Sequence, residues 1–289
     1  MQSLGWIVER SGKTKVFIKK LGPFSLIKIQ RPKDLDLSDV DRLARKYRAL
    51  LVKIEPDINA EHRIPALPAG WLNTEYSADN WPLLPTKSLI LDLDSPTLDS
   101  LPKDTRYEIR KTQKNSLSLG LSNDCELFYK LLQETMKLGG WSVPIRKEVK
   151  NLYQAFQPSN SVLLFAHLRS SSFNVPGSSS SINNPVAACL LIWHKDTAHY
   201  MYAATTKEGR RLGAAYLILW KAIQFCKKKK LKYLDLEGVY DERYPKQTKA
   251  WLGFTKFKMG WGGKVVQYPG SYTKYYNTIV KLLFRLTGS

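Results

Sequence analysis

The chain has 289 residues, of which 43% are hydrophobic, and it carries 45 lysines and arginines against 25 aspartates and glutamates. This length and composition exclude wholesale disorder and indicate either one large domain or two ordinary ones. The formal net charge of +20 favours a polyanionic partner, such as tRNA, a phosphorylated sugar or an anionic membrane face. The alternative is that surface lysines only keep the protein soluble.

Cysteine and histidine spacing predicts no metal site. Cys125, Cys189 and Cys226 are far apart in the sequence, and the four histidines form no ligand pattern with them. We therefore expect reduced, buried thiols, no metal and no cofactor. The first residues lack a signal-peptide pattern, and no stretch reaches the roughly 18 apolar residues of a membrane span. These features predict a cytoplasmic protein, with the inner face of the membrane as an open alternative.

The N-terminal part of the chain predicts a mixed α/β layer. Strand patterns occupy three short apolar runs, at residues 16–18, 24–29 and 50–54. Before the third run, Ser38 and Asp41 resemble a capping box, and apolar residues follow at helical spacing. The order strand, helix, strand is typical of α/β domains. Residues 64–85 are rich in proline, and we expect a long connection there with little regular structure.

A basic helix is predicted after a strand at residues 88–93. It begins near Asp104, and Arg106 and Arg110 are four residues apart, so they share one helix face, with Lys111 beside it. This face is a candidate stripe for binding phosphate or tRNA. A solvated helix surface is the alternative interpretation.

The remainder of the chain alternates helices with strands. Apolar residues at helical spacing predict helices at residues 125–138, 146–156, 212–230 and 275–286. Strand patterns occur at residues 161–167, 186–193 and 198–204. Serine-rich residues 170–184 predict a flexible insertion. We expect the last helix to close the core, with a membrane-surface helix carrying Lys281 and Arg285 as the alternative.

A lysine among aromatic residues and glycines is the most unusual feature near the C-terminus. Lys258 follows Phe257 and precedes a glycine-rich turn. An ammonium beside aromatic walls can bind an anion or an oxyanion. We interpret residues 253–258 as a strand in a strand-turn-strand corner, and a solvated lysine at such a corner is the alternative.

Two further patterns indicate chemistry. Arg210, Gly213 and Ala215 lie between a predicted strand and a predicted helix. In the acyl-CoA loop of GNAT acyltransferases, which this spacing resembles, backbone N–H groups cradle a pyrophosphate. Asp235 and Glu237 alternate along a predicted strand and share one face, where they could act as paired acid and base or be polar ends of the strand. No nucleophile triad follows from the spacing.

Five motifs follow one another in an informative order. They are Leu91-Asp92-Leu93, Arg106-Tyr107-Glu108-Ile109-Arg110, the pair Tyr200 and Tyr202, Leu234-Asp235-Leu236, and Phe257-Lys258 before a glycine-rich turn. In this order they resemble the Fem family of peptidoglycan-bridge aminoacyltransferases, and the resemblance spans residues 2 to about 272. Fem proteins look like two fused GNAT-like domains. The resemblance therefore implies an α/β fold of two GNAT-like mixed-sheet domains.

The same resemblance implies an activity in peptidoglycan biosynthesis, and hence a role in cell shape. A monomeric enzyme would transfer an amino acid from aminoacyl-tRNA to the stem-peptide amine of a UDP-linked or lipid-linked muropeptide. By this resemblance, Lys258 would stabilise the tetrahedral intermediate and Phe257 would support the terminal nucleotide of the tRNA. Tyr200 and Tyr202 would bind the muropeptide. The basic residues expected to bind phosphate or tRNA are Arg106, Arg110, Lys111, Arg210 and Arg211.

The chain departs from the family pattern at several positions. Leu234 replaces a tyrosine, and the proline usual at a helix entry is absent from Gly213-Ala214-Ala215. Pro144 and Val8 stand where basic residues are expected. Arg146 or Lys147, and Arg10, are the nearest substitutes, and we expect them to bind the acceptor.

We predict a first domain at residues 1–101, shortened at its N-terminus and completed by residues 272–289, and a second domain at residues 102–271. Two alternatives to the aminoacyltransferase stay open. One is an acyl-CoA-dependent GNAT N-acyltransferase that uses residues 210–215, which binding of coenzyme A would reveal. The other is a non-catalytic basic protein that binds RNA or membrane on a Fem scaffold.

Overall fold

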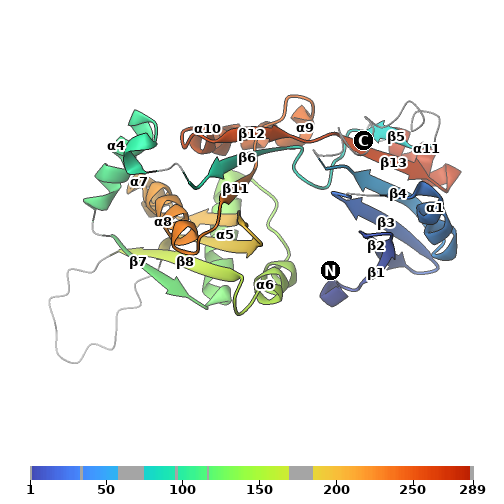
Figure 1. The fold of residues 1–289 in the computed structure, drawn as a ribbon, viewed down its shortest axis with the longest axis horizontal. Helices are drawn as coiled ribbons and strands as arrows, with labels where there is room; N and C mark the ends of the chain where they lie inside the picture. The colour runs from blue at the N-terminus through green and yellow to red at the C-terminus, as the bar shows by residue number, and fades with distance from the viewer. Residues whose placement is uncertain are drawn as a thin grey trace. The chain divides into compact units, whose positions relative to one another are not determined.

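The computed structural model describes residues 2–32, 35–57, 75–94, 97–115, 117–168 and 185–286 (Figure 1). Two expected segments fall outside these ranges. The serine-rich insertion at residues 170–184 does so entirely, and the proline-rich connection does so from residue 64 to residue 74. The chain divides into two compact units, which are described separately below. The first unit contains residues 1–88, 240–249 and 266–289, and the second contains residues 89–239 and 250–265.

A six-stranded sheet forms the first unit. Its strands lie in the order β1 (Trp6–Ser11), β2 (Thr14–Leu21), β3 (Phe24–Gln30), β4 (Ala49–Glu55), β13 (Ser271–Tyr275) and β5 (Ser77–Asp79), and a single 3-10 turn, η1 (Gln2–Leu4), precedes them. Neighbouring strands are antiparallel except β3 and β4. These two run parallel because helix α1 (Leu37–Lys46) connects them as a crossover.

Helix α1 closes the core of the first unit. Its buried residues Val40, Leu43 and Ala44 pack on alternating apolar residues of β2, β3 and β4. The helix begins slightly earlier than the predicted capping box, because its N-cap is Asp36. The Asp36 carboxylate accepts a hydrogen bond from the backbone N–H of Ser38 at 2.9 Å. This bond satisfies one of the free N–H groups in the first turn.

A buried ion pair fixes strand β13 between β4 and β5. Lys53 on β4 is almost fully buried, and its ammonium donates to the Asp79 carboxylate on β5 at 2.6 Å. Ser271 and Thr273 of β13 donate to the same carboxylate. A buried charge needs such a complete set of partners. These contacts make the C-terminal segment part of the first unit.

The C-terminal helix, α11 (Thr278–Leu286), does not close the core as expected. Ile279 is 70% exposed and Leu282 is 57% exposed, while Phe284 stacks on Trp81 with ring centroids 5.0 Å apart. The helix therefore packs through one aromatic side chain and leaves an apolar stripe on the surface. Within the described residues, no helix is both long enough and apolar enough to cross a membrane.

A seven-stranded sheet forms the second unit. Its strands lie in the order β12 (Lys264–Gln267), β6 (Lys87–Asp92), β11 (Tyr233–Gly238), β10 (Thr197–Thr205), β9 (Pro185–His194), β8 (Ser161–Leu168) and β7 (Leu117–Ser122). Helices α4 (Lys103–Gln113) and α8 (Ala214–Lys228) pack in one apolar cluster, and α5 (Cys125–Gly139) and α6 (Arg146–Ala155) pack in another. These clusters lie on opposite faces of the sheet, since neighbouring residues of β9 alternate between them. The short elements η2 (Leu98–Ser100) and α7 (Lys207–Arg211) lie in connections.

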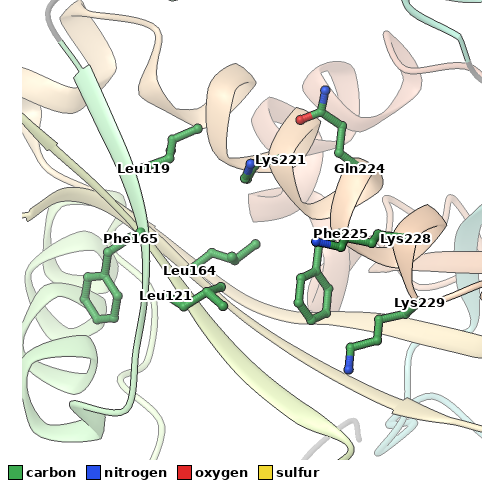
Figure 2. Close-up of a pocket in the computed structure, with 10 residues that line it drawn as sticks. Leu119, Leu121, Leu164, Phe165, Lys221, Gln224, Phe225, Lys228 and Lys229 are labelled. Atoms are coloured by element: carbon green, nitrogen blue, oxygen red, sulfur yellow. The ribbon is translucent and has the colours of Figure 1, made fainter.

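A cavity of about 700 Å³ lies between α8 and strands β7 and β8 (Figure 2). Leu119, Leu164 and Phe225 form its apolar wall, and Lys221 and Lys228 line it from α8. Leu164, with the partly buried Leu119 and Phe225, belongs to the apolar cluster of α4 and α8. The cavity is therefore on the α8 face of the sheet.

Residues 253–258 form a helix, so the predicted strand is wrong. Helix α9 (Pro245–Thr248), the turn η3 (Lys249–Trp251) and helix α10 (Leu252–Met259) follow one another. Trp251, Phe254 and Phe257 are each three residues apart, and Trp261 follows four residues later, which is helical spacing. Their rings make contacts, with centroids 5.9 Å apart for Trp251 and Phe254 and 6.1 Å apart for Phe257 and Trp261. Gly253 and Gly260, which suggested a turn, lie between these aromatic residues in the sequence.

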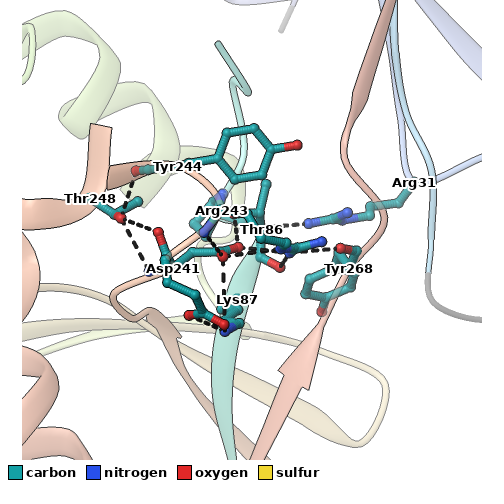
Figure 3. Close-up of polar contacts among 10 residues, drawn as sticks. Arg31, Thr86, Lys87, Asp241, Arg243, Tyr244, Thr248 and Tyr268 are labelled. Carbon is teal, nitrogen blue, oxygen red and sulfur yellow. Dashed lines mark hydrogen bonds and ion pairs between the residues drawn. The ribbon is translucent and has the colours of Figure 1, made fainter. Parts of the chain in front are cut away.

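Asp241 holds residues 240–249 in the first unit (Figure 3). Its side chain is fully buried and accepts hydrogen bonds from Thr86 at 2.6 Å and from the Arg243 guanidinium at 2.7 Å. The Thr248 hydroxyl accepts from the Asp241 backbone N–H and donates to its carbonyl oxygen. Removing any one partner would leave a buried polar group unsatisfied.

The division into units differs from the predicted domains. The first unit ends at Ser88 instead of residue 101, and it also contains residues 240–249 and the chain from residue 266. A return of the chain from residue 272 was predicted, but the return of residues 240–249 was not, because it depends on contacts such as that of Thr86 with Asp241, 155 positions apart. Local sequence patterns do not encode such returns.

Candidate active site

Strands β10 and β11 separate at one point of the second-unit sheet. They pair in parallel only at Thr197–His199 with Tyr233–Asp235, although β10 continues to Thr205 and β11 to Gly238. The pairing therefore ends at His199 and Asp235 while both strands go on. Beyond this point, the carbonyl oxygen of Gly238 on β11 accepts a hydrogen bond from the Lys258 ammonium at 2.7 Å.

The polar side chains at this opening lie on the α5 and α6 face of the sheet. Ala198, Leu234 and Leu236 are buried in the cluster of α4 and α8. Because side chains alternate along a strand, His199 and Asp235 point to the opposite face. The opening is thus on the other side of the sheet from the cavity in Figure 2.

His199, Asp235 and Glu237 form one polar cluster. Nδ1 of His199 lies 2.8 Å from Oε1 of Glu237 and 3.8 Å from Oδ2 of Asp235. Asp235 also accepts a hydrogen bond from the backbone N–H of Glu237 at 2.7 Å. The His199 side chain remains 35% exposed. Sequence reasoning placed the two carboxylates on one face but missed His199, because it comes from a different strand.

Lys258 completes this cluster from helix α10. Its ammonium donates to the carbonyl oxygen of Gly238 at 2.7 Å and lies 4.8 Å from the centroid of the Phe254 ring. Burial lowers the pKa of Lys258 to about 8, although the charges of Glu237 and Asp235 favour its protonated form. Near neutral pH the group is a desolvated cation, which interacts more strongly with a developing negative charge than a solvated lysine would.

Two other groups at the opening also have shifted pKa values. Burial alone would lower the pKa of His199, but the hydrogen bond that its ring donates to Glu237 and the charges of Glu237 and Asp235 outweigh it and raise the pKa above 6.5. Burial raises the pKa of Tyr202, and the charges of Glu148 and Glu237 add to this effect. Groups with such perturbations gathered at one point indicate a functional site.

Tyr200 and Tyr202 do not share a face, in contrast to the acceptor-binding pair that the sequence suggested. The register of β10 shifts between them, as in a β-bulge. Tyr200 is 7% exposed and belongs to the α8-side cluster, whereas Tyr202 packs against the cluster of α5 and α6. Only Tyr202 is therefore on the same face as His199, and Tyr200 is a core residue.

The model of the FemAB family matches residues 178–287. None of the curated protein sequences matches the chain. Among solved structures, FemX superposes with a TM-score of 0.75 at 16% sequence identity, over 100% of this chain and 92% of FemX. The resemblance to the Fem family is confirmed.

Two further structures show how widely the fold is shared. The C-terminal domain of a putative lysylphosphatidylglycerol synthetase from Agrobacterium fabrum has a TM-score of 0.61 at 12% identity, over 98% of this chain and 87% of that one. A tandem GNAT protein from the clavulanic acid biosynthesis pathway has a TM-score of 0.52 at 11% identity, over 93% of this chain and 81% of that one. The predicted fold of two GNAT-like mixed-sheet domains is confirmed.

Phe257, the other Fem motif residue on α10, lies in an aromatic group. Its ring contacts Tyr216 of α8 with centroids 5.0 Å apart, and it contacts Trp261 as well. The ring also packs against the α8-side core. This packing fixes the start of the turn after Lys258. A role of Phe257 toward the terminal nucleotide of a tRNA stays a prediction.

The predicted phosphate-binding residues lie on two helices of the second unit, α4 and α7. On α4, Arg110 pairs with Asp99 and Lys111 pairs with Glu108, while the partly buried Arg106 has a buried Nε without a hydrogen-bond partner. On α7, Arg210 and Arg211 are exposed, and Arg211 pairs with Glu208. The α4 stripe is therefore partly neutralised by its own neighbours.

The predicted acceptor-binding basic residues are in two places. Arg146 begins α6, where it pairs with Glu126, and Lys147 follows it on the exposed surface. Arg10 is exposed on β1 of the first unit. Their binding of an acceptor stays a prediction, as does the binding of phosphate or tRNA by the residues on α4 and α7.

Helix α4 lies against the loop that resembles an acyl-CoA site. Asn115 donates to the carbonyl oxygen of Leu212 at 2.8 Å. A Cβ on Gly213 would come within 2.6 Å of the Thr112 hydroxyl. Gly213 also has a left-handed backbone, with a φ of 70°, which favours glycine. The start of α8 is thus in close contact with α4.

The cluster of His199, Asp235 and Glu237 is also the candidate for holding a metal ion among the described residues. Its ligand atoms lie within 4.8 Å of one another, and a histidine with two carboxylates suits several divalent ions. However, the Lys258 ammonium acts on the same carboxylates. This fixed cation competes with a metal ion for their charge.

Proposed function

We propose that this protein is a tRNA-dependent aminoacyltransferase that adds an amino acid to the stem-peptide amine of a peptidoglycan precursor. The match to the FemAB family model supports the class of reaction, and it covers Tyr202, Lys258 and the opening between β10 and β11. The observation that carries the proposal is the desolvated Lys258 ammonium beside that opening. Such a group suits a reaction whose transition state gains negative charge on oxygen.

In the proposed reaction, the acceptor amine attacks the ester carbonyl carbon of aminoacyl-tRNA. The carbonyl oxygen becomes an oxyanion, and the Lys258 ammonium stabilises it. The ester C–O bond then breaks, an amide forms, and the ribose oxygen leaves with a proton. The protein contributes mainly position and charge, because binding both substrates at the strand opening makes the attack intramolecular.

The charge of the chain suits both substrates, since tRNA and a UDP-linked or lipid-linked muropeptide are anionic. We assign the muropeptide to Tyr202, with Arg146 and Lys147 of the same unit as candidate partners for its phosphates. Binding of the acceptor by Arg10, which belongs to the first unit, stays a separate prediction. We assign the tRNA to the exposed basic residues of α4 and α7. Tyr200 no longer belongs to the acceptor set, because it is buried on the other face of β10.

The packing of α4 disfavours the acyl-CoA alternative. A pyrophosphate at the start of α8 would need space beside Gly213, where Thr112 and Asn115 make contacts. The non-catalytic alternative is disfavoured by the polar cluster at the strand opening. Burying a lysine and shifting its pKa costs stability, and a protein that only binds RNA or membrane gains nothing from that cost.

We also propose that the protein works in the cytoplasm and contacts the inner face of the membrane through α11. Ile279 and Leu282 form an exposed apolar stripe, and Lys281 lies beside them. An amphipathic helix of this kind binds at the interface of an anionic membrane. The contact would bring the enzyme near a lipid-linked acceptor.

One assay tests the proposed function. Charged tRNA and a UDP-linked muropeptide are incubated with the protein, and the muropeptide is analysed by mass spectrometry. The proposal expects the mass to increase by one aminoacyl residue, only when the tRNA is charged. Transfer from an acyl-CoA instead would support the alternative enzyme.

A further inference from the structure

Nδ1 of His199 is engaged by the Glu237 carboxylate at 2.8 Å. A carboxylate accepts a hydrogen bond, so this contact places the ring proton on Nδ1 and leaves Nε2 with a lone pair. The side chain is 35% exposed at the strand opening. A fixed tautomer with one free lone pair is the arrangement that a proton acceptor needs.

The backbone of Glu237 supports a functional role for this pair. Glu237 has a φ of 63°, in the left-handed region that non-glycine residues rarely adopt. The Asp235 carboxylate stabilises this conformation by accepting from the Glu237 backbone N–H at 2.7 Å. Strained backbone that neighbours hold in place is found preferentially at active sites. Here the strain directs the Glu237 side chain to His199.

We propose that His199 accepts the proton of the attacking amine and that Glu237 positions its ring. This inference rests on the proposed function, and it adds a protein base to a reaction in which only Lys258 acts on the reacting atoms. Asp235 supports this pair indirectly. Its carboxylate fixes the backbone of Glu237 and adds negative charge beside the His199 ring.

The proton balance of the reaction is complete with this assignment. The uncharged amine forms a bond to the carbonyl carbon, and its nitrogen becomes positively charged. Nε2 of His199 takes one proton from that nitrogen. When the ester C–O bond breaks, the imidazolium returns the proton to the leaving ribose oxygen. The amide and the free hydroxyl of the tRNA are the products, and no other reactant is needed.

The charged and titratable groups around His199 set the pH dependence. Asp235 and Glu237 on β11 act on His199 directly. Glu237 also acts on Lys258 of α10 and on Tyr202 of β10, and Glu148 of α6 acts on Tyr202. The two carboxylates raise the pKa of His199, so its basic form accumulates at a higher pH than that of an ordinary histidine. The Lys258 ammonium is lost as the pH rises through about 8. The rate should therefore rise and then fall with pH.

The test is the pH profile of single-turnover transfer from charged tRNA to the muropeptide amine. We expect His199→Gln to lose about 10²- to 10⁴-fold and to lose the rising limb of the profile. We expect Glu237→Gln to move that limb to lower pH, because the carboxylate no longer raises the pKa of His199. His194→Gln, on the exposed end of β9, is the matched control and should behave as wild type.

A second nucleophile separates a chemical role from a structural one. Once it has attacked, the nitrogen of hydroxylamine is a stronger acid than that of an alkyl amine and loses its proton readily to water, so hydroxylamine depends much less on a protein base. His199→Gln should retain nearly the wild-type rate with hydroxylamine and charged tRNA. An equal loss with both nucleophiles would mean that His199 only supports the fold, and it would overturn the proposal.

The outcomes distinguish this inference from the proposed function. If wild type transfers the amino acid and His199→Gln transfers it equally fast, the inference fails and the proposed function stands. If wild type transfers nothing from charged tRNA, both fail. Loss of transfer after chelator treatment, with recovery on adding Mn²⁺ or Zn²⁺, would assign His199 to a metal site instead and would also overturn the proposal.

Discussion

Replacing Lys258 with methionine keeps the length of the side chain and removes its charge. In the proposed reaction the ammonium meets negative charge that develops only as the donor ester becomes tetrahedral. Its loss should therefore lower turnover more than substrate binding. Removing one preorganised oxyanion donor costs about 10²- to 10³-fold in comparable sites. We expect the single-turnover rate of Lys258→Met to fall by that factor.

The same variant tests the burial of the ammonium independently of catalysis. Burial lowers the pKa of Lys258 from 10.5 to about 8, which corresponds to about 3 kcal/mol at about 1.4 kcal/mol per unit. Between these two pKa values the unfolded chain binds the proton more tightly than the folded chain does. The free energy of unfolding of wild type should therefore rise by about 3 kcal/mol across this range, relative to Lys258→Met.

Lys256→Met is the matched control. Lys256 is exposed on the same helix, α10, and two helical residues point about 200° apart. The control should match wild type in transfer rate and in the pH dependence of denaturant unfolding. Equal transfer rates for wild type and Lys258→Met would refute the oxyanion role. Parallel stability curves for these two proteins would refute the burial argument.

Four other predictions concern the charge, the rival cofactor, the first unit and the last helix. Binding of tRNA should weaken steeply with salt through counterion release, and a flat titration would remove tRNA as the partner. Calorimetry should detect no binding of micromolar coenzyme A; a tight one-to-one complex would instead support the acyl-CoA alternative. Asp241→Asn should destabilise the first unit by about 2 kcal/mol in urea, because it removes the charged acceptor of the hydrogen bonds from Thr86 and the half-buried Arg243, whereas the exposed Asp99→Asn should cost less than about 1 kcal/mol; equal costs would contradict the role of the Asp241 cluster. Leu282→Asn should weaken sedimentation with anionic vesicles, whereas Leu121→Asn, at an exposed leucine on β7, should not; equal binding by both would contradict membrane contact through α11.

Helices and strands with a clear apolar period could be predicted from the sequence. The predicted helix at 125–138 matches α5, and the strand at 161–167 matches β8, because in each the buried residues recur at one period. The prediction of a strand at residues 253–258 was wrong. Their aromatic residues have helical spacing, but the surrounding glycines favoured a turn, and packing of Phe257 on Tyr216 decides for the helix.

The candidate site could be predicted only in part. Asp235 and Glu237 are two residues apart on one strand, so their common face follows from the sequence. The contact between His199 and Glu237 depends on the register of β10 against β11, two strands whose residues are 38 positions apart. The separation of Tyr200 from Tyr202 depends on a bulge, which has no strong sequence signal. Pairing between strands therefore decides both the contact of His199 with Glu237 and the face on which each tyrosine lies.

The sheet of the first unit shows a similar limit. The apolar pattern of β4 was recognised, but its neighbour β13 comes from a segment more than 200 residues later in the sequence. Lys53 on β4 is buried because Asp79 and β13 enclose it. A buried charge of this kind is detectable only when its partner is known.

The most direct test of the central claim is a crystal structure with a stable analogue of the tetrahedral intermediate. An aminoacyl-phosphonate linked to the terminal adenosine of tRNA carries an anionic oxygen where the oxyanion would be. The account predicts that this oxygen lies within hydrogen-bond distance of the Lys258 ammonium, at the opening between β10 and β11. Binding of the phosphonate elsewhere, for example in the cavity beside α8, with Lys258 still bonded only to Gly238, would contradict it.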